Sequence, residues 1–143
     1  MSTECPFCIV LADNHNLFRQ DLKRILEEKG DLKVVAETGD GLELLNLLNL
    51  SKLAPHLVIL DMSMPNLGGI EATRKIKMTH PDLKVLILSM HKDKEYLQEA
   101  FTAGAEGYLL KEDANKDIFS AIEIIRGGGI FVSPFSPNLA GRK

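Results

Sequence analysis

The stretch HLVILDMSMPNLGGIEA, residues 56–72, contains the pattern that decides the fold. It opens with an apolar run over residues 57–60 that ends at Asp61, and after a short loop it continues with helical spacing from Ile70. A strand that is apolar at every position is typical of the centre of a parallel sheet, where helices cover both faces. The stretch therefore predicts one strand–loop–helix unit of an α/β fold.

The same unit recurs along the whole chain. Short apolar runs predict five strands, and the segments that follow them have apolar residues at a spacing near 3.6, which predicts five helices. Gly30 closes the first expected helix, and Gly104 and Gly127 follow the fourth and fifth. The expected strands cover residues 8–12, 33–37, 57–60, 84–88 and 107–110.

This alternation predicts a doubly wound, flavodoxin-like α/β fold with a five-stranded parallel sheet in the order 2-1-3-4-5. A length of 143 residues fits one domain. We assign residues 1–129 to that domain. We expect residues 130–143, which hold two prolines and no periodic pattern, to be a tail or the start of a linker to a further domain absent from this chain.

Composition and charge exclude some classes of partner. Seventeen Lys and Arg against twenty Asp and Glu give a formal charge of −3, which argues against a chain that grips nucleic acid or an anionic membrane by itself. No apolar run approaches the ~20 residues that span a bilayer, and no cationic segment precedes the first apolar run. We therefore expect a cytoplasmic protein with no membrane partner.

The two cysteines, Cys5 and Cys8, stand in the order Cys-Pro-Phe-Cys. This spacing would suit a redox pair or half of a zinc site, but a structural zinc usually has four ligands and no second such pair follows. We interpret both as structural thiols, with Cys8 in a buried strand.

Polar side chains stand where the expected strands end. Asp13 follows the first strand, Asp61 the third, Ser89 the fourth and Lys111 the fifth. Ligands of doubly wound sheets bind beyond the carboxyl ends of the strands, and the first and third strands are neighbours at the point where the strand order reverses. Two adjacent carboxylates favour a hard cation such as Mg²⁺, and a carboxylate can attack phosphorus while a lysine and a hydroxyl contact the transferred group.

Four segments together resemble the receiver domain of two-component response regulators, nearest the NarL/LuxR type: CIVLADNHNLFR (8–19), HLVILDMSMPNLGGIEA (56–72), VLILSMH (85–91) and GAEGYLLK (104–111). The likeness extends from about Cys8 to Ser133, with the motifs in the family's order. It implies a signalling switch that catalyses its own phosphorylation, rather than a conventional enzyme. The phosphoryl donor would be the phosphohistidine of a sensor histidine kinase.

The resemblance also implies a role for each residue of the site. Asp61 would be the phosphoacceptor, and Asp13, Asn14 and the backbone carbonyl of Ser63 would hold Mg²⁺ beside it. Ser89 and Lys111 would contact the phosphoryl group. Tyr108 would be the switch aromatic that turns inward as Ser89 moves to the phosphate. The face made of the fourth helix, fifth strand and fifth helix would then change its affinity for a partner.

One position departs from the family pattern. The second of the two adjacent acidic residues that usually follow the first strand is Asn14 here, so the site lacks one negative charge. Attraction to a cation at contact distance is worth about 4 kcal/mol per unit charge at an effective dielectric near 20, although the desolvation of another carboxylate offsets much of it. We therefore expect weaker metal binding and slower phosphotransfer than in the family at large.

Other functions remain open from the sequence. A receiver-like interaction module that takes no phosphate is an alternative because of Asn14. A phosphatase with an aspartyl nucleophile is another, although Ser63 stands where such enzymes have a second Asp. A nucleotide-binding module is weaker because no glycine-rich loop follows the first strand. In the full-length regulator that the resemblance implies, DNA would be bound only through an effector domain absent from this chain, and phosphorylation could drive a homodimer.

Overall fold

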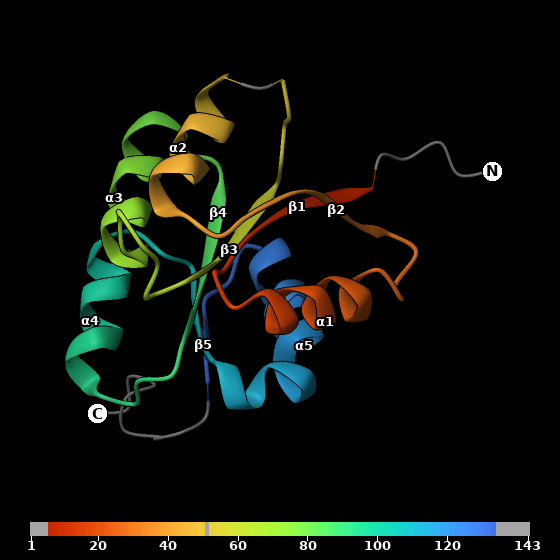
Figure 1. The fold of residues 1–143 in the computed structure, drawn as a ribbon. Coiled ribbons are helices and arrows are strands. Elements are labelled where there is room, and N and C mark those ends of the chain that lie inside the picture. Colours follow the sequence, from red (N-terminus) through yellow and green to blue (C-terminus); the bar gives the residue numbers. More distant parts are fainter. Residues whose placement is uncertain (1–5, 51, 134–143) are drawn as a thin grey trace.

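The computed structural model describes residues 6–50 and 52–133, in which strands and helices alternate (Figure 1). The elements in chain order are β1 (Phe7–Ala12), α1 (Asn16–Leu26), β2 (Leu32–Thr38), α2 (Gly41–Leu50), β3 (Leu57–Asp61), α3 (Gly69–Thr79), β4 (Lys84–Ser89), α4 (Lys94–Thr102), β5 (Gly107–Leu110), the 3₁₀ turn η1 (Lys111–Asp113), α5 (Ala114–Arg126) and β6 (Phe131–Val132).

The strands form one parallel sheet in the order β2-β1-β3-β4-β5-β6. The predicted order 2-1-3-4-5 and the flavodoxin-like α/β class are therefore confirmed, and each predicted strand agrees with the observed one to within one residue at either end. The agreement has a simple cause: β1, β3, β4 and β5 are buried on both faces, so their sequences are continuously apolar.

A sixth strand, Phe131–Val132, extends the sheet beyond β5. The sequence analysis expected no regular structure from Ile130 onward, and for these two residues that expectation is wrong. The strand was missed because two residues are too few to show a periodic pattern. The buried Ser133 follows, and its Oγ accepts a hydrogen bond from the Leu110 amide at 2.8 Å. The rest of the expected tail, residues 134–143, lies outside the described residues.

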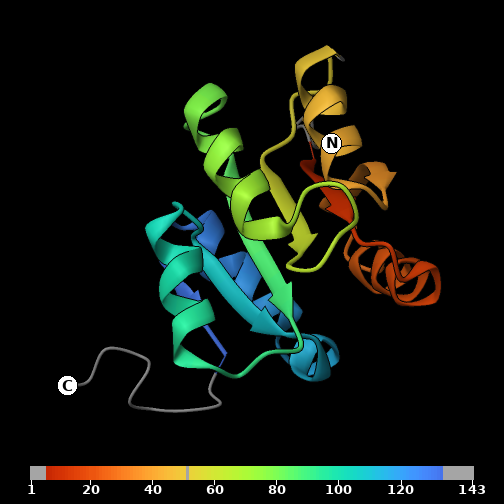
Figure 2. The same cartoon turned by 60° about the vertical axis from the view of Figure 1, so that its left-hand side comes forward.

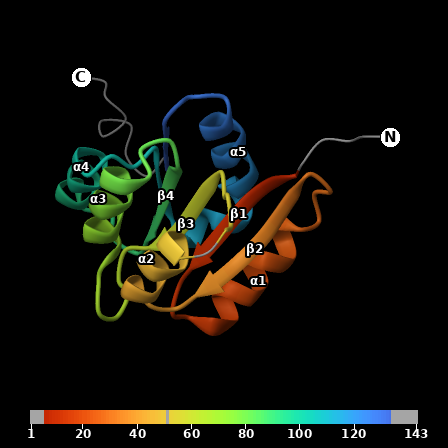
Figure 3. The same cartoon turned by 90° about the horizontal axis from the view of Figure 1, so that it is seen from above.

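Two cores flank the sheet. Helices α1 and α5 pack on one face through residues such as Leu22 and Ile118, and α2, α3 and α4 pack on the other through residues such as Leu44, Ile76 and Leu97. Figure 3 shows the sheet edge-on between these two groups of helices, and the arrowheads of the central strands in Figure 2 point to one common edge. The loops at that edge therefore converge from both layers.

Helix α1 ends at Leu26, four residues before Gly30, which the sequence analysis took as its close. After Leu26 the backbone tightens, since the amides of Glu28 and Lys29 bond to the carbonyls three residues earlier. Within residues 6–50 and 52–133, no helix has both the length and the apolar composition to cross a bilayer.

Candidate functional site

Two buried aspartates meet at the carboxyl edge of the sheet. Ala12 of β1 is paired with Leu60 of β3, so Asp13 and Asp61 come next on neighbouring strands. Their exposed fractions are only 2% and 3%. The parallel register thus brings together two carboxylates that are 48 residues apart in the sequence, as the strand-end argument predicted.

A lysine pairs with both acids. Lys111 begins η1 directly after β5, and its Nζ lies 2.8 Å from Asp13 Oδ2 and 3.4 Å from Asp61 Oδ1. Burial raises the pKa of Asp61, as does the neighbouring charge of Asp13, while Lys111 and the Ser63 amide oppose the increase. The pocket therefore holds two acids against one ammonium, and an additional cation would relieve the remaining repulsion.

The donor atoms fit a hard divalent cation. Within the described part of the chain, Asp61 Oδ2 is buried without a hydrogen-bond partner, and Asp13 Oδ2 has the Lys111 ion pair but no contact of hydrogen-bond geometry. One ligand atom each from Asp13, His15 and Asp61 lies within 4.8 Å of the other two. Mg²⁺ prefers carboxylate oxygens and keeps several waters, so the two aspartates are the pair that suits it.

His15 had no predicted role, and the structure brings it into this cluster. Its Nδ1 lies 2.8 Å from Lys111 Nζ and 3.2 Å from Asp13 Oδ1, and its amide donates to Asp13 Oδ1 at 2.8 Å. The contact was missed because Lys111 is 96 residues away, and no local pattern links the two. Asn14, between Asp13 and His15, is exposed at the rim of the site.

The loop after β3 is held tightly against the β2–α2 turn. The Gly41 amide donates to the Pro65 carbonyl at 3.2 Å, and Asn66, in the left-handed region with φ of 69°, donates from its side chain to Asp40. Ser63, whose carbonyl the sequence analysis assigned to the metal, is exposed in this loop, and its amide hydrogen-bonds to the Asp61 carboxylate. A fixed loop gives the Ser63 backbone a fixed place beside Asp61.

A second set of contacts connects Ser89 with Tyr108. Ser89 Oγ accepts a hydrogen bond from the His91 amide at 2.9 Å and lies 3.7 Å from Met62 Sδ. The Tyr108 ring is fully buried, and its hydroxyl donates to the His91 carbonyl at 3.0 Å. Burial raises the pKa of the Tyr108 phenol, and a hydrogen bond with Ser89 opposes the increase. Both side chains thus hold the backbone of His91, in the loop between β4 and α4. The predicted order 2-1-3-4-5 leaves the strand of Tyr108 at the edge of the sheet, whereas in the structure β6 pairs with β5 on that side.

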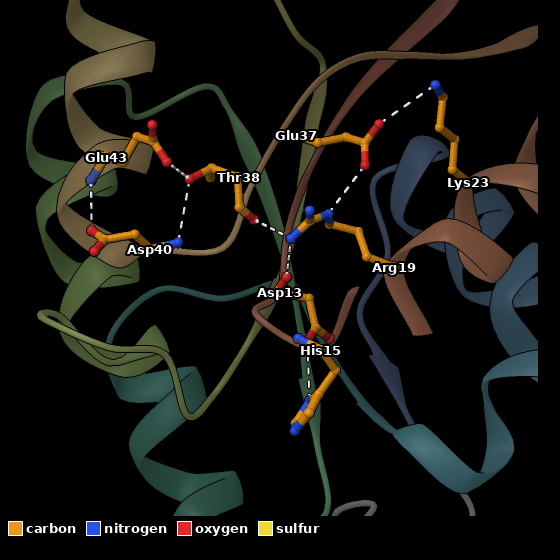
Figure 4. A network of polar contacts seen from close by, with 8 residues as sticks. All are labelled: Asp13, His15, Arg19, Lys23, Glu37, Thr38, Asp40 and Glu43. Atoms are coloured by element: carbon orange, nitrogen blue, oxygen red, sulfur yellow. Dashed lines mark hydrogen bonds and ion pairs between the residues drawn. The ribbon is translucent and has the colours of Figure 1, made fainter. Parts of the chain in front are cut away.

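Arg19 of α1 connects the loop after β1 to the end of β2 (Figure 4). Its guanidinium donates to the carbonyl of Asp13 and, at 3.3 Å, to the carbonyl of Thr38, and Nε donates to Glu37 at 3.1 Å. The Thr38 hydroxyl continues the network to Glu43. Asp13 is therefore held through its backbone as well as its side chain.

Comparison with known proteins identifies this architecture. The family described as the response regulator receiver domain matches residues 9–123. The chain belongs to the response regulator receiver domain family. Receiver domains are phosphoacceptors rather than conventional enzymes, so the family weighs against the phosphatase alternative.

The relatives of this receiver domain are regulators of the LuxR/NarL type, as its motifs suggested. The transcriptional regulatory protein DegU of Brevibacillus brevis is 39% identical over 126 residues, which are 88% of this chain and 52% of DegU. A LuxR-family response regulator from Aurantimonas sp. SI85-9A1 superimposes with a TM-score of 0.84 at 34% identity, over 94% of this chain and 93% of that one. The isolated receiver domain of RcsB from Salmonella enterica serovar Typhimurium, solved with the phosphomimetic BeF₃⁻, gives 0.83 at 28% identity over 94% and 96%. This chain spans about half the length of the curated relatives that it matches.

Proposed function

We propose that this receiver domain accepts a phosphoryl group on Asp61 from the phosphohistidine of a sensor histidine kinase, in a Mg²⁺-dependent reaction. The observation that carries the proposal is the buried pair of Asp13 and Asp61 with the Lys111 ammonium between them. Receiver domains pair with histidine kinases, which supports the choice of donor. The cytoplasmic location expected from the sequence is part of this proposal.

In the transfer step, a carboxylate oxygen of Asp61 attacks phosphorus while the bond from phosphorus to the kinase imidazole breaks. An acyl phosphate forms on Asp61, and the imidazole leaves with the electron pair and takes up a proton. Asp61 must be ionised to attack; Lys111 and the Ser63 amide favour that form against the effect of burial.

Asp13, Asn14, Asp61 and the Ser63 carbonyl would hold Mg²⁺, which supplies positive charge against the phosphoryl oxygens when bound. Lys111 would contact the phosphoryl group from its place beside both acids. Ser89 would donate a hydrogen bond from its hydroxyl, whose acceptor Met62 Sδ at 3.7 Å is weak and easily given up.

Phosphorylation would act on α4, β5 and α5 through His91. A phosphoryl group brings about −1.5 to −2 charge and three strong acceptors. If Ser89 Oγ turns toward it, the His91 amide loses its acceptor, while the Tyr108 hydroxyl still donates to the His91 carbonyl and the His91 and Tyr96 rings stay in contact. The loop would then move against the Tyr108 ring, which in this structure is already buried in the inward position that we assign to the active state. About 5.5 kcal/mol of differential interaction moves such an equilibrium from 1:99 to 99:1.

The output that we propose is control of transcription through a DNA-binding effector domain outside these 143 residues. A relative of which the match covers about half, DegU, carries the name of a transcriptional regulatory protein, and dimers of RcsB have been solved on DNA. We propose that this receiver likewise forms a homodimer on phosphorylation. The net charge of −3 supports the proposal that another domain, and not the receiver, binds the DNA.

The second candidate is an interaction module that takes no phosphate. One observation favours it, namely the amide of Asn14 where the family usually has a second carboxylate. The two functions differ in whether Asp61 reacts.

Incubation with acetyl phosphate and Mg²⁺, followed by mass spectrometry of the intact protein, tests the proposal directly. We expect one added phosphoryl group on the wild type, none on Asp61→Asn, and none when EDTA removes the cation. An unmodified wild-type protein that also fails to bind BeF₃⁻ would favour the interaction module. Steady release of phosphate from an ester, without accumulation of the phosphoprotein, would favour the phosphatase.

A further inference from the structure

The Lys111 ammonium has a third polar partner besides the two acids. His15 Nδ1 lies 2.8 Å from Lys111 Nζ, the same distance as Asp13 Oδ2. An ammonium can only donate, so in this contact Nδ1 accepts, as it can in the tautomer that carries its proton on Nε2. The same Nδ1 atom lies 3.2 Å from Asp13 Oδ1, so the imidazole contacts both members of the Asp13–Lys111 ion pair.

An aromatic ring completes the surroundings of this ammonium. Lys111 Nζ lies 4.7 Å from the centre of the Phe18 ring, within the range of a cation–π contact. His15 occupies the N-cap position of α1 and Phe18 is three residues further on, so the start of one helix supplies both contacts to Lys111. With the acids on one side and these two rings on the other, the lysine side chain is only 8% exposed.

These rings also line a cavity that Ser89 and Lys111 share. A cavity of about 390 Å³ is lined by His15, Phe18, Ser89, Lys111 and neighbouring residues. Its lining includes both groups that we assign to the phosphoryl oxygens, Ser89 and Lys111, but neither Asp13 nor Asp61. A lysine has a flexible four-carbon stem, so without lateral contacts its ammonium would spend much of its time away from this space.

We propose that His15 and Phe18 are positioning residues that hold the Lys111 ammonium at the acidic pair, ready to meet a phosphoryl group. This inference rests on the proposed function, although the contacts of Lys111 with His15 and Phe18 can be tested without phosphate. The two residues act through Lys111 and touch neither the acceptor carboxylate nor the transferred group.

The first test measures the accessibility of the Lys111 amine in Mg²⁺-free protein. A limiting amount of an amine-acylating reagent is applied, and modification at Lys111 is quantified by peptide mass spectrometry. We expect it to rise about tenfold in His15→Ala, which loses a hydrogen bond to a charged group, and about two- to fivefold in Phe18→Leu. His15→Asn, which keeps an acceptor, should fall between His15→Ala and the wild type.

Phe119→Leu is the matched control, because Lys29 Nζ lies over the Phe119 ring at 5.1 Å in the same kind of contact elsewhere in the molecule. It should leave Lys111 labelling unchanged. Equal labelling of Lys111 in the wild type, His15→Ala and Phe18→Leu would overturn the proposal. If His15→Ala fails to fold, Phe18→Leu and His15→Asn still decide the question.

The second test asks whether His15 acts through Lys111. BeF₃⁻ affinity with saturating Mg²⁺ is measured for wild type, His15→Ala, Lys111→Ala and the double variant. We expect His15→Ala to weaken binding in the wild-type background and to have no further effect once Lys111 is absent. An equal loss in both backgrounds would show that His15 acts by another route. If the wild type itself binds no BeF₃⁻, the proposed function fails, while the labelling result still decides whether His15 and Phe18 hold the Lys111 ammonium in place.

Discussion

At the scale of single residues, charge balance in one pocket governs the chemistry. Asp13 and Asp61 are buried side by side, and Lys111 neutralises only one of the two charges. The cost of this arrangement shows in the raised pKa of Asp61. A pocket whose negative charge is only partly neutralised gains most from binding a cation, so the repulsion that destabilises the metal-free protein also favours Mg²⁺ binding.

Replacing the acceptor should stabilise the metal-free protein. Burial and the charge of Asp13 raise the pKa of Asp61 in the folded protein. At pH values above this raised pKa, the ionised carboxylate therefore lowers the free energy of unfolding, and this penalty disappears below the ordinary aspartate pKa. We expect Asp61→Asn to increase the free energy of unfolding at neutral pH by about 1–3 kcal/mol, as for relief of an unsatisfied buried group. The gain should shrink as the pH falls toward about 4.

Urea unfolding in EDTA at several pH values measures this difference. Asp21→Asn is a suitable control, since Asp21 is exposed and pairs only with Arg24 on the same helix at 3.3 Å among the described contacts. A gain that stays constant with pH, or a loss of stability, would contradict the pKa argument.

Restoring the second acid should strengthen metal binding. Asn14→Asp adds one negative charge at the rim of the pocket, and we expect the Kd for Mg²⁺ to fall about tenfold, since desolvation and repulsion from Asp13 and Asp61 offset most of the added attraction. Isothermal titration of both proteins with Mg²⁺ at one ionic strength checks this. Equal affinities would mean that residue 14 does not face the cation.

At the scale of elements, backbone packing sets the geometry of the loops. A Cβ on Gly69 would lie 2.5 Å from the carbonyl oxygen of Asp61 and 2.8 Å from the Cα of Met62. The start of α3 therefore touches the backbone of the acceptor itself, and only glycine allows this approach.

Gly69→Ala should displace the acceptor. We expect a loss of about 1–3 kcal/mol in the free energy of unfolding, as for overpacking, together with slower acetyl phosphate labelling of Asp61. Gly30→Ala is the matched control, because a Cβ there meets nothing within 4 Å. Denaturant titration and labelling rates measure both effects, and a Gly69→Ala protein as stable and as reactive as the wild type would refute the packing argument.

The end of the sheet offers a separate test. Ser133 is 1% exposed, and its hydroxyl oxygen accepts a hydrogen bond from the amide of Leu110. Leu110 is the last residue of β5 and directly precedes Lys111. Ser133→Ala leaves that buried amide without its acceptor, which should cost about 1–3 kcal/mol. Ser120→Ala on the exposed side of α5 should cost far less. Chemical unfolding of the two variants checks this, and equal stabilities would mean that the strand β6 contributes little.

At the scale of the whole molecule, the site belongs to the sheet and not to any one element. Its groups come from the ends of β1, β3, β4 and β5, and the helical layers on both faces hold those ends in register. Binding at this edge should therefore stabilise the entire fold.

Mg²⁺ should raise global stability by mass action. At a free concentration of 100 times the Kd, the free energy of unfolding should increase by about 2.7 kcal/mol, because the unfolded chain does not bring Asp13 and Asp61 together. Thermal unfolding with and without EDTA measures this increase. Asp13→Asn should abolish most of it, and an equal response in that variant would place the cation elsewhere.

The sequence alone determined the class of fold, the strand order and the identities of the residues at the strand ends. It could do so because strands buried on both faces must be apolar throughout, which makes β1, β3 and β4 visible as uninterrupted runs, and because parallel strands deliver their carboxyl ends to one edge. Asp13, Asp61 and Lys111 were predicted to meet for this reason, and they do.

Only the tertiary structure decided the contacts between side chains from distant segments. The pairing of Lys111 with His15 and Phe18, the hold of Tyr108 on the His91 carbonyl and the strand Phe131–Val132 have no periodic signal, because each depends on a neighbour supplied by another part of the fold. A sequence pattern predicts only whether a position is buried or exposed to solvent. Which side chain or backbone group a residue contacts is decided only when distant segments pack together in the folded protein.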